Sequence, residues 1–174
     1  MSLNKRVAVA KLEARPALFD LHADAAERAE LAARNGVLAI DSLDAHIELR
    51  RLEGGRISLD GRLGAKLTQR CVITLEPLAQ SIDEPFHYDF GPAEDLVDPA
   101  KGEVQIDLNS DLEPLPGDVL ELGDLVAEQL ALAIDPYPKA PGAQLQAPAE
   151  SAESDGKGGK NSPFAALAAL KPKV

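Results

Sequence analysis

Two alternating stretches around the dipeptide Gly54-Gly55 constrain the fold of this chain more than any other feature. Over residues 43–50, apolar side chains occupy every second position and polar or charged ones stand between them. Residues 57–67 repeat the alternation after the glycines. A period of two indicates a strand with one buried face, and paired glycines suit the turn between two such strands. The pattern predicts an antiparallel β-hairpin with one apolar face and one polar face.

Further periodic segments lie on both sides of the hairpin. A third strand is predicted over residues 82–90, where Phe86, Tyr88 and Phe90 alternate with polar residues and are expected to fill the core. Shorter edge strands are predicted over residues 7–12 and 104–108, with Phe19-Asp20-Leu21 leading into the first helix.

Two helices are predicted by composition, periodicity and end signals. The first begins near Ala23 or Asp24 and ends at Asn35-Gly36, a common C-terminal stop. The second has an apolar face over residues 122–134, with Asp118 or Glu121 as N-terminal caps, and ends before Pro136.

The resulting fold class is α+β. We expect one domain over residues 1–138, in which an antiparallel sheet, either a meander or a barrel-like form, packs against two main helices. After Pro138 the composition changes to Ala, Pro, Gln, Ser, Gly and Lys, which predicts a disordered linker over residues 139–161. Residues 162–174 predict a short terminal helix, which docks either on its own domain or on a partner.

Charge is distributed unevenly along the chain. The net charge is −11, yet residues 71–138 alone carry Lys101 as the only Lys or Arg against 16 Asp and Glu, a net of −15. Such a block repels a phosphate backbone and suits a basic protein partner, although it would also serve solubility alone. Only 3% of the residues are aromatic and none is Trp, which disfavours stacking on bases or sugars.

The amino-terminal residues and the apolar segments predict a soluble, cytoplasmic protein. Residues 1–10 lack the apolar run of a signal peptide, and no segment approaches the roughly 20 apolar residues of a membrane span. The single cysteine, Cys71, agrees with a reducing compartment.

Motifs for catalysis or metal binding are sparse. Cys71 has only His46 and His87 as candidate bases, both at outward strand positions, so a packed structural cysteine is the favoured interpretation. With His22, these side chains are scattered singly and predict no zinc site. The sequence has no phosphate-binding glycine loop, no dinucleotide-binding pattern and no Gly-x-Ser-x-Gly. We therefore expect no enzyme activity, no cofactor and no metal.

Three stretches, residues 68–77, 121–138 and 162–167, together resemble the bacterial YceD family of large ribosomal RNA subunit accumulation proteins. Many members have Cys-x-x-Cys in the first stretch, whereas this chain has Cys71 followed by Thr74. The motif residues, which are also the candidate partner-binding residues, are Cys71, Thr74, Glu76, Pro77, Asp124, Glu128, Gln129, Pro136, Tyr137, Pro138, Pro163, Phe164 and Leu167.

The resemblance implies a non-enzymatic factor that supports large-subunit RNA accumulation and ribosome assembly. Combined with the charge distribution, it predicts binding of a ribosomal protein or rRNA-processing factor through an acidic surface, with no membrane and no small-molecule substrate. The alternative is direct rRNA binding by the basic face of the hairpin over residues 43–70, through Arg50, Arg51, Arg56, Arg62, Lys66 and Arg70.

Overall fold

A computed structural model of the chain describes residues 3–13, 15–92, 97–98, 103–104, 112–115 and 117–144. The chain divides into two units, Met1–Ala143 and Gln144–Val174, and the helices and strands of the described residues lie in the first. The elements are β1 (Arg6–Ala8), the 3₁₀ helix η1 (Val9–Lys11), β2 (Ala17–His22), α1 (Ala25–Asn35), β3 (Ala39–Arg51), the 3₁₀ helix η2 (Glu53–Gly55), β4 (Ile57–Arg70), β5 (Pro77–Gly91), β6 (Val97–Asp98), β7 (Glu103–Val104), β8 (Leu112–Pro114), β9 (Val119–Glu121) and α2 (Leu122–Ala133).

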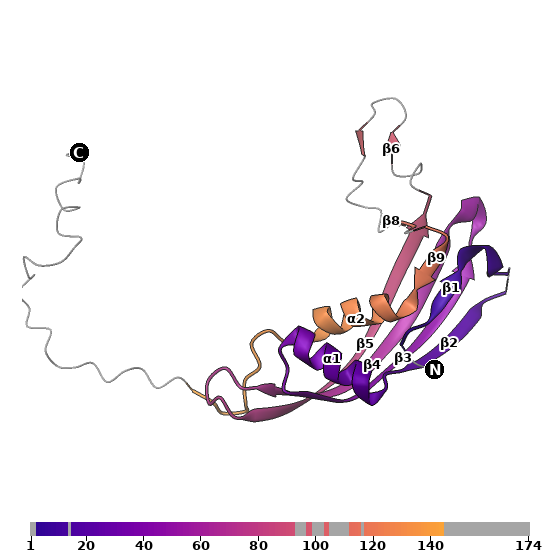
Figure 1. The fold of residues 1–174 in the computed structure, drawn as a ribbon. Coiled ribbons are helices and arrows are strands. Elements are labelled where there is room, and N and C mark those ends of the chain that lie inside the picture. The colour runs from indigo at the N-terminus through magenta and orange to yellow at the C-terminus, as the bar shows by residue number, and fades with distance from the viewer. Residues whose placement is uncertain are drawn as a thin grey trace, which may run out of the picture. The chain divides into compact units, whose positions relative to one another are not determined.

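The main sheet has five strands in the order β2-β3-β4-β5-β8 (Figure 1). The predicted hairpin is confirmed as β3 and β4, joined at Glu53–Gly55, and β5 continues the meander antiparallel to β4. The α+β class is confirmed. The sheet is open, with β2 and β8 at its edges, so the barrel-like alternative is wrong. It is also mixed, because β8 runs parallel to β5.

The amino-terminal strands differ from the prediction. Residues 17–22 form the edge strand β2, which pairs with β3, whereas Phe19-Asp20-Leu21 was predicted only to lead into the helix. The predicted strand over residues 7–12 is limited to β1, because η1 follows it directly, and β1 pairs with β9 outside the main sheet. Both pairings join segments that are distant in sequence, which local periodicity cannot reveal.

Helix α1 confirms its predicted ends. Asp24 is the N-cap, and its carboxylate accepts the amide hydrogens of Ala26 and Glu27. The Glu27 side chain accepts the Asp24 amide in return, which completes a capping box. Gly36 ends the helix in the left-handed conformation that glycine adopts without strain.

The core lies between one face of the sheet and the two helices (Figure 1). The predicted inward residues of the hairpin and the three aromatic residues of β5 are buried, and Leu122, Val126 and Leu130 cover them from α2. Gly61 of β4 lies opposite Phe86 of β5. A Cβ atom at Gly61 would lie 2.2 Å from Phe86 Cζ, so the glycine makes room for the aromatic ring.

The start of α2 is bound by backbone groups instead of the predicted side-chain caps. Glu121 is the N-cap, but its side chain accepts no amide hydrogen of the helix, and Asp118 is not the cap. The Leu122 amide donates to the carbonyl of Lys5 at 2.9 Å. A Cβ atom at Gly123 would lie 2.2 Å from the carbonyl oxygen of Leu3, so this glycine permits the close contact.

Several predicted segments lie wholly or largely outside the described residues. They are most of the loop at 92–102, the strand at 104–108 beyond Val104, most of the linker at 139–161, and the terminal helix with Pro163, Phe164 and Leu167. The predicted domain boundary at Pro138 stays a prediction.

Candidate protein-binding surface

Cys71 is fully buried at the turn between β4 and β5. Its sulfur accepts the backbone amide of Thr74 at 3.4 Å and that of Ala140 at 3.3 Å. Hydrogen bonds from Thr74 and then from Ala140 outweigh burial and lower the thiol pKa to about 6. The candidate bases lie elsewhere: His46 bonds to Asp20, and His87 to Asp60. The thiol has no exposed surface in the structure, which fits a packed cysteine.

The Cys71 turn is bound to the segment that leaves α2. The Val72 amide donates to the Pro138 carbonyl at 2.9 Å, and the Gln69 side-chain amide donates to the Asp135 carbonyl at 2.8 Å. Cys71, Thr74 and Pro138, predicted from two separate motifs, therefore meet in one place. Val72 is 42% exposed.

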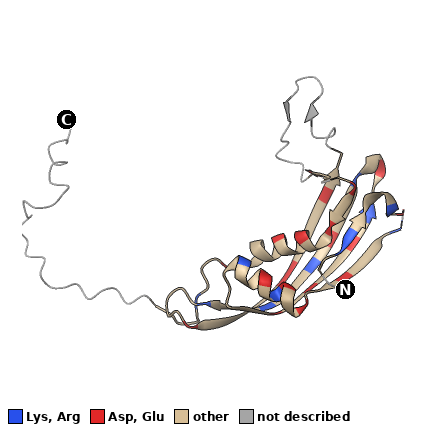
Figure 2. Cartoon of the chain, viewed as in Figure 1, with Lys and Arg blue, Asp and Glu red and all other residues tan. Residues whose placement is uncertain are grey.

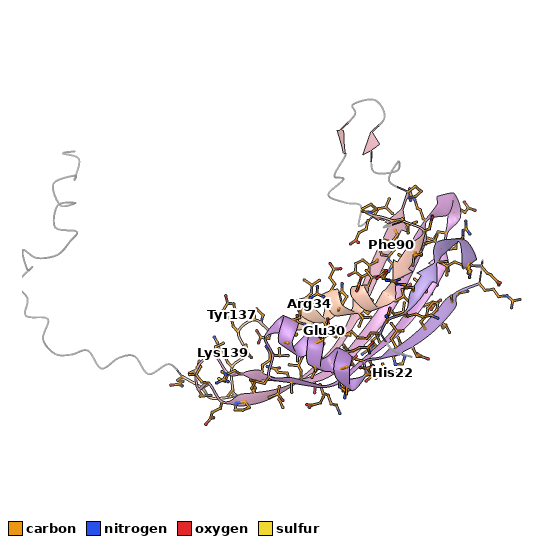
Figure 3. The ribbon with its side chains drawn as sticks, viewed as in Figure 1. His22, Glu30, Arg34, Phe90, Tyr137 and Lys139 are labelled. Atoms are coloured by element: carbon orange, nitrogen blue, oxygen red, sulfur yellow. The ribbon has the colours of Figure 1, made fainter. Side chains whose placement is uncertain are left out.

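Around this turn, Leu75 is 61% exposed and Tyr137 70% exposed (Figure 3). Glu76 and Pro77 are exposed, and so is Pro136. The described residues contain no group of three or more His, Cys, Asp or Glu side chains that could hold a metal ion.

An acidic stripe runs along the exposed side of α2. It consists of Glu121, Asp124, Glu128 and Leu132, at spacings that place them on one helix face (Figure 2). Leu132 is 73% exposed, and the helix Leu122–Ala133 contains no basic residue. Glu121 pairs with Arg6 at 3.0 Å. The stripe thus joins two carboxylates that have no ion pair within the described residues, those of Asp124 and Glu128, to an exposed apolar side chain.

Beside the stripe, a surface hollow brings α2 next to β8 and the end of β5. It is lined by His87, Tyr88, Leu112, Glu113, Glu128, Gln129 and Leu132. Partial burial, and secondarily the charge of Glu128, raises the pKa of the Glu113 carboxyl. Neither Glu113 nor Glu128 has an ion-pair partner within the described part of the chain. The position is therefore one where a cation would be stabilised.

Gln129 is the structural member of this hollow. Its side-chain amide donates to the Tyr88 hydroxyl at 2.6 Å, which fixes α2 on β5. Burial raises the Tyr88 pKa, so the hydroxyl stays protonated at neutral pH. Of the predicted residues on α2, Asp124 and Glu128 face solvent while Gln129 contacts the core.

On the other side of the stripe, a second hollow separates α2 from α1. Glu27 and Glu30 line it from α1, and Glu121 and Asp124 from the start of α2. Arg34 and Lys5 line it too, so this hollow carries both signs of charge (Figure 3).

Two of the six basic residues predicted on the hairpin face are paired with carboxylates. Arg62 binds Asp83 through two hydrogen bonds of 2.7 Å, and Arg50 binds Glu48 at 2.7 Å. His22 pairs with Asp44 across the strands β2 and β3. These carboxylates compete with phosphate for the arginines, which weakens the rRNA-binding alternative.

Sequence reasoning missed Glu113 and the histidine–aspartate pairs. Glu113 stands in a short strand whose parallel pairing to β5 has no local signal. The pair His22–Asp44 depends on the register of β2 on β3, which places these residues opposite one another and which local periodicity does not give.

Comparison with known proteins gives one family. A family model described as large ribosomal RNA subunit accumulation protein YceD matches residues 59–171. That span includes β4 from Leu59 onward, β5, the Cys71 turn and α2. Neither the curated proteins nor the solved structures provide a match. In the residues that the structure describes, no helix is long and apolar enough to cross a membrane.

Proposed function

Since the chain belongs to the YceD family of large ribosomal RNA subunit accumulation proteins, we propose that it supports this accumulation by binding a basic protein through the acidic stripe of α2. The partner is a ribosomal protein or an rRNA-processing factor, met in the cytoplasm. The protein acts without catalysing a reaction.

The observation that carries the proposal is the pair Glu113 and Glu128. Both carboxylates line one hollow, where partial burial and, second to it, the charge of Glu128 raise the pKa of Glu113. Neither has an ion-pair partner in the described residues, so the two charges repel each other unopposed. An arginine or lysine from another protein would relieve that repulsion. Leu132 lies one turn along the same helix face and offers an apolar contact beside the charges.

A protein partner fits this surface better than RNA does. The block at 71–138 has a net charge of −15, and the helix contributes no basic side chain to it. RNA binding draws its affinity from Lys and Arg that replace counterions, so this surface would repel RNA. Opposite charge on a protein partner would instead speed association and orient it.

The proposal is tested by complementation of a deletion strain. Asp124→Lys combined with Glu128→Lys reverses the exposed charges of α2 without touching its buried face. We expect the double variant to leave precursor large-subunit rRNA elevated and mature rRNA reduced, as in the deletion strain. Northern analysis of both species, normalised to small-subunit rRNA, measures the effect.

A matched control distinguishes an effect of the α2 position from a general effect of added positive charge or of lost stability. Glu53→Lys makes the same kind of change at the exposed hairpin tip and should restore normal rRNA levels. Equal protein abundance and equal melting temperatures are required of all variants. Full complementation by the α2 double variant would refute the proposed role of the stripe. Loss of complementation by Arg50→Ala with Arg62→Ala, together with loss of rRNA binding, would support the hairpin alternative.

A further inference from the structure

Among the described residues, nothing pairs with the outer edge of β5 over most of its length. β5 has 15 residues, and β8 pairs only with Asp89, Phe90 and Gly91 at its end. No other strand in the described residues pairs with the outer side of β5. The residues preceding Asp89 therefore present a long sheet edge, a structure that natural proteins usually cover, shorten or protect.

The register identifies which backbone groups point outward. The Gly91 carbonyl accepts the Leu115 amide at 2.9 Å, so Gly91 faces away from β4. The pairing of β5 with β4 runs without a bulge, and alternate residues of an antiparallel strand turn both backbone groups to the same side. Ala79, Ser81 and Asp83 therefore direct their amides and carbonyls to the open edge.

Two prolines mark the ends of this open segment. Pro77 and Pro85 share the outward parity of Ser81, so their missing amide hydrogens remove no hydrogen bond to β4. Between them, residues 78–84 form an uninterrupted strand with every outward residue able to donate and accept. Prolines at these positions limit the length of any added strand to this segment.

The side chains along the segment indicate what would fit. Leu78 and Ile82 are partly buried on the inner side, whereas Ala79, Ser81 and Asp83 are exposed on the outer side. β5 carries Asp83, Glu84 and Asp89 and no Lys or Arg. Asp83 is already bound by Arg62, and Glu84 has no ion pair within the described residues.

We propose that residues 78–84 of β5 bind an extended basic segment of a partner protein as an added β-strand. The backbone supplies the hydrogen bonds, Leu78 and Ile82 receive apolar side chains, and the acidic residues select Lys or Arg. A second copy of this chain fits less well, because β5 has no Lys or Arg that could pair with the carboxylates of another β5. The inference rests on the proposed function: the basic partner that binds the acidic stripe of α2 would make a second contact at the β5 edge.

The test uses the full chain and a short acetylated peptide that alternates Val and Lys. Amide hydrogen exchange measured by NMR should slow at Ala79, Ser81 and Asp83 when the peptide is added. Ser81→Pro removes one outward amide at a position equivalent to Pro77 and Pro85, and should weaken peptide binding at least tenfold. Ser81→Val keeps the amide and should bind at least as well as the wild type. Circular dichroism and melting temperature verify that both variants fold.

Three results would overturn the inference: no protection at these amides with saturating peptide, equal binding by Ser81→Pro, or equal binding of a Val/Glu peptide. A monomer–dimer equilibrium that Ser81→Pro abolishes would assign the edge to a second copy and also overturn it. If Ser81→Pro restores rRNA levels in cells while the α2 double variant does not, the edge proposal fails and the proposed function stands. If instead the α2 double variant restores rRNA levels while the peptide still protects the β5 amides, the proposed function fails and the edge proposal stands.

Discussion

Replacing Gly61 with alanine should destabilise the protein, whereas the same change at Gly64 should not. A Cβ atom at Gly61 would lie 2.2 Å from Phe86 Cζ and 2.5 Å from both Cε atoms, far inside contact distance. At Gly64, three residues along the same strand, a Cβ atom meets nothing within 4 Å. The two variants thus carry the same substitution in the same strand, but only the added methyl group at position 61 meets an aromatic ring.

Overpacking a core costs about 1–3 kcal/mol, and removing a strand glycine returns roughly 0.5–1 kcal/mol. We expect Gly61→Ala to lower the free energy of unfolding by about 1–2 kcal/mol and Gly64→Ala to raise it by about 0.5 kcal/mol. With a urea m-value of roughly 2 kcal/mol/M, the two midpoints should differ by about 1 M. Far-UV circular dichroism in urea measures them.

A double-mutant cycle identifies the ring as the cause. Phe86→Leu removes the atoms that Gly61→Ala would strike, so the combined variant should be more stable than the sum of the two single changes predicts, by about 1 kcal/mol. Strict additivity, or a Gly61→Ala variant as stable as Gly64→Ala, would show that the ring does not need the glycine.

Three further results are expected. Asp24→Ala removes the acceptor of the α1 capping box and should cost about 1 kcal/mol in urea unfolding, with Asp24→Asn retaining most of that stability. The folded state lowers the Cys71 pKa to about 6 from 9.0, so the thiolate stabilises the fold fully above pH 9 and this stabilisation disappears as pH falls through 6. The difference in free energy of unfolding between the wild type and Cys71→Ala should therefore widen from pH 6 to 9. A difference that does not change with pH would contradict this prediction. The His87 ring donates a hydrogen bond to the Asp60 carboxylate, and this bond raises the His87 pKa. The stabilisation is therefore present below the unfolded pKa of 6.5 and disappears as pH rises through the folded value; NMR titration should show the His87 pKa falling in Asp60→Asn.

Local periodicity predicted the elements whose sequence decides their conformation. The hairpin, the aromatic half of β5 and both helices follow from apolar spacing, and the ends of α1 follow from Asp24 and Gly36. The elements that it missed depend on distant partners. β2 and β8 have too few residues for a clear period, and pairing with β3 and β5 makes them strands.

The candidate surface was predicted in part for the same reason. Asp124 and Glu128 belong to the stretch that resembles the YceD family and to the acidic block at 71–138, and both grounds are available from the sequence. Glu113 joins them only through the parallel pairing of β8, and Ala140 reaches the Cys71 sulfur only because the chain returns after α2. The backbone cap from Lys5 likewise has no sequence signature, since any residue carries a carbonyl.

The most direct test of the account is quantitative affinity purification of the tagged full chain across a salt series. The wild type and Glu53→Lys should recover the same large-subunit ribosomal protein or processing factor, with recovery falling as salt rises. Asp124→Lys with Glu128→Lys should lose that protein while keeping its melting temperature. Equal recovery by the double variant, or recovery that does not depend on salt, would contradict binding through the acidic stripe of α2.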